Sequence, residues 1–333
     1  MRMLARWFAL IALMLAPSAW AANGSYSGLY VFGDSLVDSG NAYIGTLGAE
    51  PSPANGYFAG RFSNGFNFAD YLSFMISGKP TTALLAGGLN AAVGGATAAY
   101  DPAETSPSFL SQIGYYDKLN GKPIDPNALV LVTFGGNDVR DTIGTGGAVD
   151  FSASVQALAY GLSELYQQGA RNLLIVGSPD IGLLPASALL AGGVPGRLAE
   201  LTARSQALNT QLAALAGLAN TVPGVTAGYF DLFGYEHDLL ANPAAYGLPS
   251  TLNTTTPCQI PGAGSPQLVN CSNALYFDAI HPTTQVHKAI ATAIAGQLGI
   301  RAVPETQIWV MLILGVGMAG ASLRRRRAHA VPA

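Results

Sequence analysis

Three short apolar runs stand out along the chain without alternating polar residues, and a fourth candidate follows them. Each run ends where the chain turns polar, at a glycine or an aspartate. Strands that are buried on both faces have this uninterrupted pattern, which is typical of a parallel sheet covered by helices. The pattern therefore predicts buried strands at residues 29–32, 128–134, 173–176 and 225–230.

The segments between these runs repeat apolar residues every three or four positions, as one face of a helix does. The predicted helices cover residues 64–77, 151–167 and 198–219. A further helix is expected to begin at Pro282, because proline suits the first turn of a helix. Strand and helix thus alternate, which predicts an α/β sandwich with a parallel sheet. Ligands of such sheets bind beyond the carboxyl ends of the strands.

The composition of the chain favours one large domain, and the two ends of the chain differ from it. Of the 333 residues 50% are hydrophobic and 11% charged, and glycine and proline are spread along the chain instead of gathering in a linker. The net charge is −3, and four of the 16 basic residues lie together at 324–327. The body of the chain therefore has no basic stripe, which argues against nucleic acid as a partner.

The first 21 residues have the layout of a secretory signal peptide. Arg2 and Arg6 give a positive start, an apolar stretch follows, and Ala19-Trp20-Ala21 matches a cleavage site with small residues. We expect the mature chain to begin at Ala22. An uncleaved membrane anchor is the alternative, but the apolar stretch is shorter than the roughly 20 residues that a membrane span needs.

A second apolar stretch, residues 308–323, is followed directly by the four arginines 324–327. A buried core helix would not end in such a cluster, whereas a membrane segment would. Together with the preceding Pro304-Glu305, the tail resembles the PEP-CTERM sorting signal of exported proteins, although Thr306 stands where that signal usually has proline. The resemblance implies transient membrane association and removal of the tail by a sorting protease of the exosortase type. The expected organisation is a signal peptide (1–21), a catalytic domain (22–302) and a sorting tail (303–333).

The chain has two cysteines, Cys258 and Cys271, in a stretch rich in Pro, Gly, Ser and Asn. In an exported protein such a pair indicates a disulfide that closes a loop, and two free buried thiols are the alternative. A zinc site has little support, because neither a Cys-x-x-Cys pair nor a His-Glu-x-x-His motif occurs.

Ser35 and His281 are candidates for catalysis. Ser35 follows the first predicted strand by three residues, which places it at the carboxyl edge of the sheet. A serine hydroxyl needs a base to act as a nucleophile, and the base needs a carboxylate that orients it. His281 lies three residues after Asp278, so the Asp278 carboxylate could hold one ring nitrogen while the other serves as the base.

Attack of Ser35 on a carbonyl group would produce an oxyanion, which needs hydrogen-bond donors. Two glycine-containing turns could provide them. In residues 90–97, paired glycines let a backbone N–H approach a substrate without interference from a Cβ atom. Residues 133–138 end the second predicted strand with Asn137, whose amide could donate. Each turn taken alone is more often a plain turn than a catalytic one.

Taken together and in this order, these segments resemble the GDSL family of the SGNH hydrolase superfamily, which comprises exported lipases and esterases. The resemblance covers most of residues 28–299, through the blocks FGDSLVDSGN (32–41), GRFSNG (60–65), NAAVGGAT (90–97), TFGGND (133–138), GSPDIGLLP (177–185), LNTQL (208–212) and FDAIHPT (277–283). It implies a flavodoxin-like three-layer α/β/α sandwich and ester hydrolysis without a metal or another cofactor.

Carried over by position, the family pattern makes Ser35 the nucleophile and Asp278 and His281 its partners. The donors to the oxyanion would be the N–H of Ser35, the side chain of Asn137, and a glycine that is Gly94 or Gly95. We prefer Gly95, because it precedes the family's small residue and threonine. Other conspicuous residues receive structural roles: loop support (Asp34, Asp38), strand-end caps (Asp180, Asp231), a structural histidine (His287) and a solvated face (His237). Tyr43 and Phe58 are candidates for the lining of a substrate pocket.

The leading hypothesis is an exported serine esterase or lipase that passes through an acyl-enzyme and is located in the periplasm, at the outer membrane or cell surface, or outside the cell. Its partner is an ester of a lipid, an aryl alcohol or an acylated sugar. The second hypothesis is an esterase that removes O-acetyl groups from a surface polysaccharide. A surface-attached binding protein would explain the tail but not the catalytic residue types in family order.

Overall fold

The computed structural model describes residues 26–102, 105–262, 264–265 and 270–300. The expected signal peptide (1–21) and sorting tail (303–333) lie outside the described residues. Within the part of the chain that is described, no helix combines the length and apolar character needed to cross a membrane.

The centre of the fold is a parallel sheet of four strands in the order β1-β2-β3-β4. The strands are β1 (Leu29–Gly33), β2 (Leu129–Thr133), β3 (Asn172–Val176) and β4 (Thr226–Phe230). Every residue of β1 and β2 is buried, and so are four of the five residues of β3. The four predicted strands and their parallel arrangement are therefore confirmed. Uninterrupted apolar runs form them because both faces of the sheet are covered.

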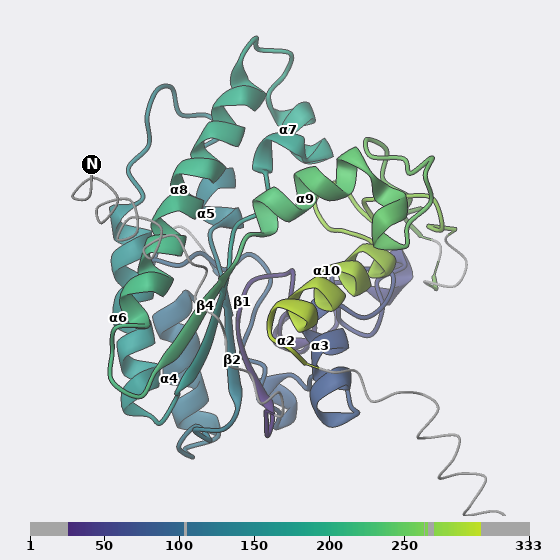
Figure 1. Ribbon diagram of the computed structural model, residues 1–333. Helices are drawn as coiled ribbons and strands as arrows, with labels where there is room; N and C mark the ends of the chain where they lie inside the picture. Colours follow the sequence, from purple (N-terminus) through teal and green to yellow (C-terminus); the bar gives the residue numbers. More distant parts are fainter. Residues whose placement is uncertain (1–25, 103–104, 263, 266–269, 301–333) are drawn as a thin grey trace, which may run out of the picture.

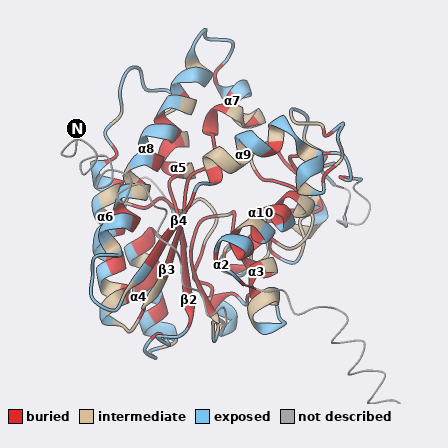
Figure 2. Ribbon diagram, viewed as in Figure 1, coloured by how far each residue is buried: buried red, intermediate tan, exposed pale blue. Residues whose placement is uncertain are grey.

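Helices form a layer on each side of the sheet (Figure 1). On one side, α4 packs against α6 and α6 against α8, and α8 also contacts β3 and β4; on the other side, α10 packs against α3. Figure 2 shows the sheet as a buried centre between helices whose outer faces are exposed. The helices are α2 (Asn41–Gly45), α3 (Phe68–Ser77), α4 (Phe109–Leu119), α5 (Gly136–Arg140), α6 (Ser152–Gln167), α7 (Pro185–Leu190), α8 (Arg197–Ala219), α9 (Leu232–Ala241) and α10 (Thr284–Gln297).

The predicted helices at 151–167 and 198–219 correspond closely to α6 and α8, whereas two other predicted starts were too early. Helix α3 begins at Phe68, not at residue 64, because Asn67 caps it: the Asn67 side chain accepts from the N–H of Asp70, and the Asp70 carboxylate accepts from the N–H of Asn67. Helix α10 begins at Thr284, two residues after Pro282, which instead pairs with Tyr276 in an isolated antiparallel bridge.

An extended segment, residues 89–93, runs beside β1 without being a regular strand. The N–H of Val31 donates to the carbonyl of Leu89 (3.1 Å), and the N–H of Ala91 donates to the carbonyl of Val31 (2.8 Å). One step further, the N–H of Val93 donates to the carbonyl of Gly33 at 3.1 Å. Gly94 and Gly95, which directly follow this segment, therefore lie at the edge of the sheet where β1 ends.

Candidate active site

Ser35 lies just beyond the end of β1, and Gly33 allows the chain to pass close to β2 on its way to Ser35. A Cβ atom at Gly33 would come within 2.7 Å of Thr133, so only glycine fits between β1 and β2 at this point. The side chain of Gln112 secures both backbone groups of Gly33: its Oε1 accepts from the N–H of Gly33 (3.0 Å) and its Nε2 donates to the carbonyl of Gly33 (2.8 Å). Ser35 is thus presented from a fixed strand end.

Three of the expected catalytic residues come together at this edge. The Oγ of Ser35 lies 2.7 Å from Nε2 of His281, and Nδ1 of His281 lies 2.7 Å from Oδ2 of Asp278. Asp278 and His281 are only 8% and 7% exposed. The other carboxylate oxygen of Asp278 accepts from the backbone N–H groups of Ile280 (2.8 Å) and His281 (2.7 Å), which fixes the short loop between the two side chains.

The charge state of Asp278 decides where the protons lie. Burial alone would raise the pKa of the Asp278 carboxyl, but the adjacent His281 and the hydrogen bonds that the carboxylate accepts lower it to about 2. An ionised carboxylate can only accept, so Nδ1 of His281 carries the hydrogen and donates it. Nε2 is then the acceptor, and the Ser35 hydroxyl donates to it.

Tyr57 is a member of this network that the sequence did not suggest. Its hydroxyl donates to Oδ2 of Asp278 at 2.8 Å, the same oxygen that accepts from His281. Burial and the negative charge of Asp278 raise the pKa of Tyr57, so the phenol keeps its proton. The two residues are 221 positions apart, and no local pattern links them. Tyr57 also packs edge-to-face against Phe62 and Phe277.

The two glycines of residues 90–97 differ in their contacts. The N–H of Gly94 donates to Oδ2 of Asp38 (3.0 Å), so it is occupied, whereas among the described residues the N–H of Gly95 has no acceptor. Gly95 has a φ of 82°, a conformation that favours glycine. A Cβ atom at Gly94 would lie 2.3 Å from the ring of Phe62, and that ring packs against His281 with centroids 5.1 Å apart.

Asn137 links this glycine segment to the catalytic pocket. It lies in the first turn of α5, and one hydrogen of its side-chain amide is donated to the carbonyl of Ala96 at 2.9 Å. The second amide hydrogen has no other acceptor among the described residues. Asn137 lines the same pocket as Ser35 and His281, while Gly95 is not among the residues that line it.

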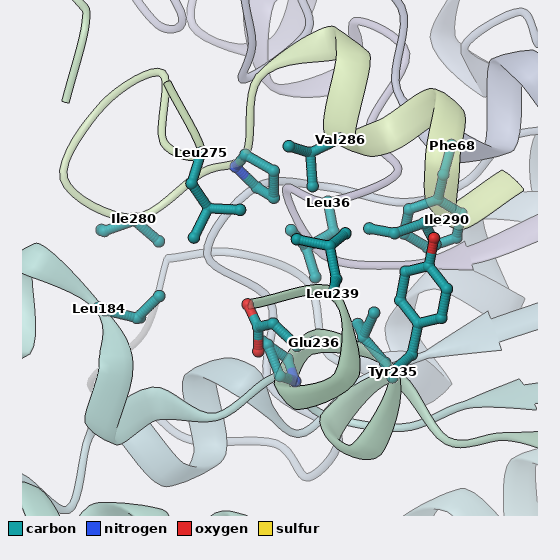
Figure 3. Close-up of a pocket in the computed structure, with 13 residues that line it drawn as sticks. Leu36, Phe68, Leu184, Tyr235, Glu236, Leu239, Leu275, Ile280, Val286 and Ile290 are labelled. Atoms are coloured by element: carbon teal, nitrogen blue, oxygen red, sulfur yellow. The ribbon is translucent and has the colours of Figure 1, made fainter. Parts of the chain in front are cut away.

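The pocket at Ser35 adjoins a second, apolar pocket. The first has a cavity volume of about 30 Å³, and its wall includes Asp34 and Arg140. The second has a cavity volume of about 20 Å³ and shares Leu36, Leu184 and Ile280 with the first. Figure 3 shows the second pocket, which apolar side chains surround together with Tyr235 and Glu236.

Five other residues have positions that agree with their expected structural roles, and two of them make further contacts at the site. Asp38 is buried and accepts from the N–H groups of its own loop, as expected, but it also reaches Gly94 across the site. Asp34 accepts from the N–H of Leu36 and in addition lines the catalytic pocket. Asp180 and Asp231 cap the helical turns that follow β3 and β4. His287 is fully buried in the interior.

Three residues depart from expectation. The side chain of His237 is 43% exposed, but it is not merely solvated, because its Nε2 lies 3.0 Å from Oδ2 of Asp180. Tyr43 and Phe58 do not line either pocket at the site. Phe58 packs against Phe66, and Tyr43 lies against the backbone of Gly48 and Gly60, so the loop folds on itself instead of facing the site.

Cys258 and Cys271 are joined in a disulfide with a Cα–Cα distance of 5.4 Å. The disulfide lies in a small hydrophobic cluster with Tyr57 and Phe277, the residue directly before Asp278. The bridged loop therefore supports the side of the site that holds the carboxylate. Among the residues that the structure describes, no group of three or more His, Cys, Asp or Glu side chains is placed to hold a metal ion.

Comparison with known proteins shows the family of the chain. Residues 29–294 match the GDSL-like Lipase/Acylhydrolase family. Among curated proteins, GDSL esterase/lipase 7 of Arabidopsis thaliana is 28% identical, covering 85% of this chain and 93% of its own length. A phosphatidylcholine-sterol acyltransferase of Aeromonas hydrophila is 25% identical over 86% of this chain and 95% of its own.

Among solved structures, the acetylxylan esterase Axe2 of Geobacillus stearothermophilus aligns with a TM-score of 0.46 and 15% identity, covering 84% of this chain and 97% of that one. The family match, which spans both Ser35 and His281, is the decisive finding. The chain belongs to the GDSL-like lipase/acylhydrolase family and is a carboxylic ester hydrolase.

Proposed function

We propose that Ser35, His281 and Asp278 carry out the ester hydrolysis. The observation that carries this proposal is the unbroken hydrogen-bond chain from Oγ of Ser35 through the imidazole to Oδ2 of Asp278, with both distances at 2.7 Å. Ser35 attacks the ester carbonyl while Nε2 of His281 takes its proton. His281 then gives that proton to the departing alcohol, and water, activated by the same nitrogen, releases the acid from Ser35.

The oxyanion of the tetrahedral intermediate needs donors that are free before the substrate arrives. Among the described residues, the N–H groups of Ser35 and Gly95 have no acceptor, and the amide of Asn137 has one hydrogen to spare. The bond from Asn137 to Ala96 joins the two turns that supply these donors. We propose Ser35, Gly95 and Asn137 as the oxyanion hole, in preference to Gly94, whose N–H is used by Asp38.

The apolar pocket beside Ser35 supports an ester with a short acyl chain as the substrate. It shares Leu36, Leu184 and Ile280, which Figure 3 labels, with the catalytic pocket. An acyl group bound to Ser35 can therefore enter it. Its cavity volume is about 20 Å³, and a cavity needs roughly 10–15 Å³ to hold one water molecule. The free space therefore suits a short chain, and longer chains must displace side chains.

The same small volume supports the second candidate function, removal of O-acetyl groups from a carbohydrate. A profile of p-nitrophenyl esters from acetate to octanoate tests acyl length. We expect kcat/KM to fall about tenfold or more beyond butyrate, because overpacking a pocket costs about 1–3 kcal/mol. A maximum at octanoate would contradict the short-chain assignment. Release of acetate from an acetylated polysaccharide, measured beside p-nitrophenyl acetate, separates the two candidates.

The catalytic assignment is tested by Ser35→Ala with p-nitrophenyl acetate. We expect turnover to be lost, with an unchanged circular dichroism spectrum and unfolding midpoint. Ser27→Ala is the matched control, because Ser27 precedes the same strand at the opposite edge of the sheet, where its hydroxyl donates to Asp125. Turnover by the Ser35→Ala variant at the rate of the Ser27→Ala variant would disprove the role of Ser35.

We propose further that the protein is exported, with cleavage before Ala22 and a membrane-associated tail that a sorting protease removes. The layout of residues 1–21 and 303–333 supports export, and so does the disulfide, because such bonds persist in oxidising compartments. Cell fractionation with mass determination of the protein from each fraction tests this. Recovery of the full-length chain from the cytosol alone would contradict it.

A further inference from the structure

Arg140 is a charged residue of the catalytic pocket to which the proposed reaction assigns no role. It is the last residue of α5, the short helix that begins after β2 and also carries Asn137. Its side chain lines the same pocket as Ser35, Asn137 and His281. A cation at this place acts on whatever part of a substrate lies next to the reacting ester.

Arg140 differs from the other arginines in the described part of the chain. Arg61 pairs with the carboxylate of Asp70, with its NH2 3.0 Å from Oδ1. The remaining three donate to backbone carbonyls: Arg171 to Tyr166, Arg197 to Ile143 and Arg204 to Thr142. Among the described residues, the guanidinium of Arg140 has neither a hydrogen bond nor an ion pair. Its five N–H donors are therefore available to a ligand.

The carboxylates nearby do not hold Arg140 as a structural partner. Asp138 is already bonded to the N–H of Ala98 and the hydroxyl of Ser154. Asp34 lies in the pocket wall, but no ion pair joins it to Arg140. Burial raises the pKa of Asp34 to about 6, although the N–H of Leu36, the neighbouring His281 and the charge of Arg140 oppose this rise. Asp34 thus feels the charge of Arg140 from a distance.

We propose that Arg140 binds a negatively charged group on the alcohol part of the ester substrate. A guanidinium binds carboxylate and phosphate groups through two parallel hydrogen bonds, so either group fits. This assignment rests on the proposed function of Ser35, because it places the charge relative to the ester that Ser35 attacks.

The neighbouring pocket decides which part of the substrate carries the charge. That pocket, proposed above for the acyl chain, is lined by Leu184, Leu275, Ile280 and other apolar side chains, and Glu236 is the one carboxylic acid among its lining residues. An anionic acyl chain would lose its hydration there and face a second carboxyl group. The alcohol part stays in the pocket at Ser35, which Arg140 lines. The substrate class is therefore an ester of a short, uncharged acid with an alcohol that bears a carboxylate or a phosphate.

Two acetyl esters of similar size and shape, one anionic and one neutral, test this assignment. In 4-acetoxybenzoate the alcohol part is anionic, and in 4-acetoxybenzamide it is neutral. For each variant we compare kcat/KM for the anionic ester with kcat/KM for the neutral ester. We expect Arg140→Gln to lower this ratio about tenfold, mainly through KM, because the variant loses one charged hydrogen-bonded pair with the anionic ester. Arg140→Lys should keep part of the ratio. Because both esters are compared within each variant, their intrinsic reactivities cancel.

Arg171→Gln is the control, since Arg171 lies at the start of β3, away from the catalytic edge, and its loss should leave the ratio unchanged. An equal fall for both esters in Arg140→Gln would show a structural role and overturn the proposal. A second pair, mono-4-nitrophenyl glutarate and 4-nitrophenyl valerate, places the charge on the acyl part. A charge preference for this pair that Arg140→Gln removes would overturn the assignment to the alcohol. Hydrolysis of these esters by Ser35→Ala would instead overturn the proposed function itself.

Discussion

Replacement of Tyr57 by phenylalanine removes one hydroxyl from the catalytic network and leaves the ring contacts with Phe62 and Phe277 in place. The lost bond is a 2.8 Å donation to the buried, ionised Asp278. Hydrogen bonds to charged groups contribute about 1.5–3 kcal/mol. Asp278 keeps three other donors, two backbone N–H groups and His281, so we expect the lower end of this range. On the reaction rate this corresponds to about a tenfold loss of kcat.

The same substitution changes how stability depends on pH. The pKa of Asp278 is lowered to about 2 in the folded protein, so its ionised form contributes stability above its unfolded pKa of about 4. That contribution is lost as the pH falls towards 2. Without the Tyr57 donor the folded pKa rises, and the variant should begin to unfold at a higher pH than the wild type. Urea unfolding between pH 3 and pH 7 and p-nitrophenyl acetate kinetics measure the two effects.

Tyr71→Phe is the matched control for Tyr57→Phe. It removes a tyrosine hydroxyl bond of the same length, 2.8 Å, but to the uncharged Oγ1 of Thr284. Its kcat should stay close to that of the wild type, and its acid unfolding should not shift. A kcat for Tyr57→Phe within twofold of the wild type, with unchanged acid unfolding, would refute the positioning role of Tyr57.

Two further predictions concern stability. The double change Cys258→Ser and Cys271→Ser opens a loop whose ends are 13 residues apart, which should cost about 3 kcal/mol of unfolding free energy in urea; a midpoint that matches the wild type under both oxidising and reducing conditions would contradict this. Burial raises the pKa of Glu236 to about 7, so the wild type should lose about 2–3 kcal/mol of stability as the pH rises from about 4 through 7. Glu236→Gln should lack this loss, and a parallel loss in the variant, measured by thermal unfolding from pH 4 to pH 8, would assign it to other groups.

The sequence predicted the sheet well because its strands depend on short-range pattern. A run without alternating polar residues must be covered on both faces, and β1, β2 and β3 begin and end within one residue of the predicted ends. β4 also matches within one residue, although Thr226 at its start is exposed. Helix starts were less predictable. The start of α3 is set by Asn67, which caps the helix together with Asp70. The apolar pattern before Asn67 is weaker than this capping, and it predicted a start that was too early.

The candidate catalytic residues could be found from motifs, but their surroundings could not. Ser35, Asp278 and His281 lie in short conspicuous blocks. Tyr57 contributes through a contact with a residue 221 positions away, and the local sequence around it indicates only a loop. Arg140 looks like an ordinary helix end until the absence of a partner among the described residues is seen. Such roles depend on contacts between loops that are far apart in the sequence. A single sequence does not show these contacts.

The long separation between the two reacting side chains has a consequence for the order of events in folding. Ser35 leaves the first strand, whereas His281 enters just before the last described helix, 246 residues later. Helix α10 must dock on α3, near the beginning of the chain, before base and nucleophile meet. Contacts between such distant segments form slowly, because the loop between them must close first. Recovery of ester hydrolysis during refolding should therefore lag behind recovery of helix content, so that activity reports the final closure of the domain.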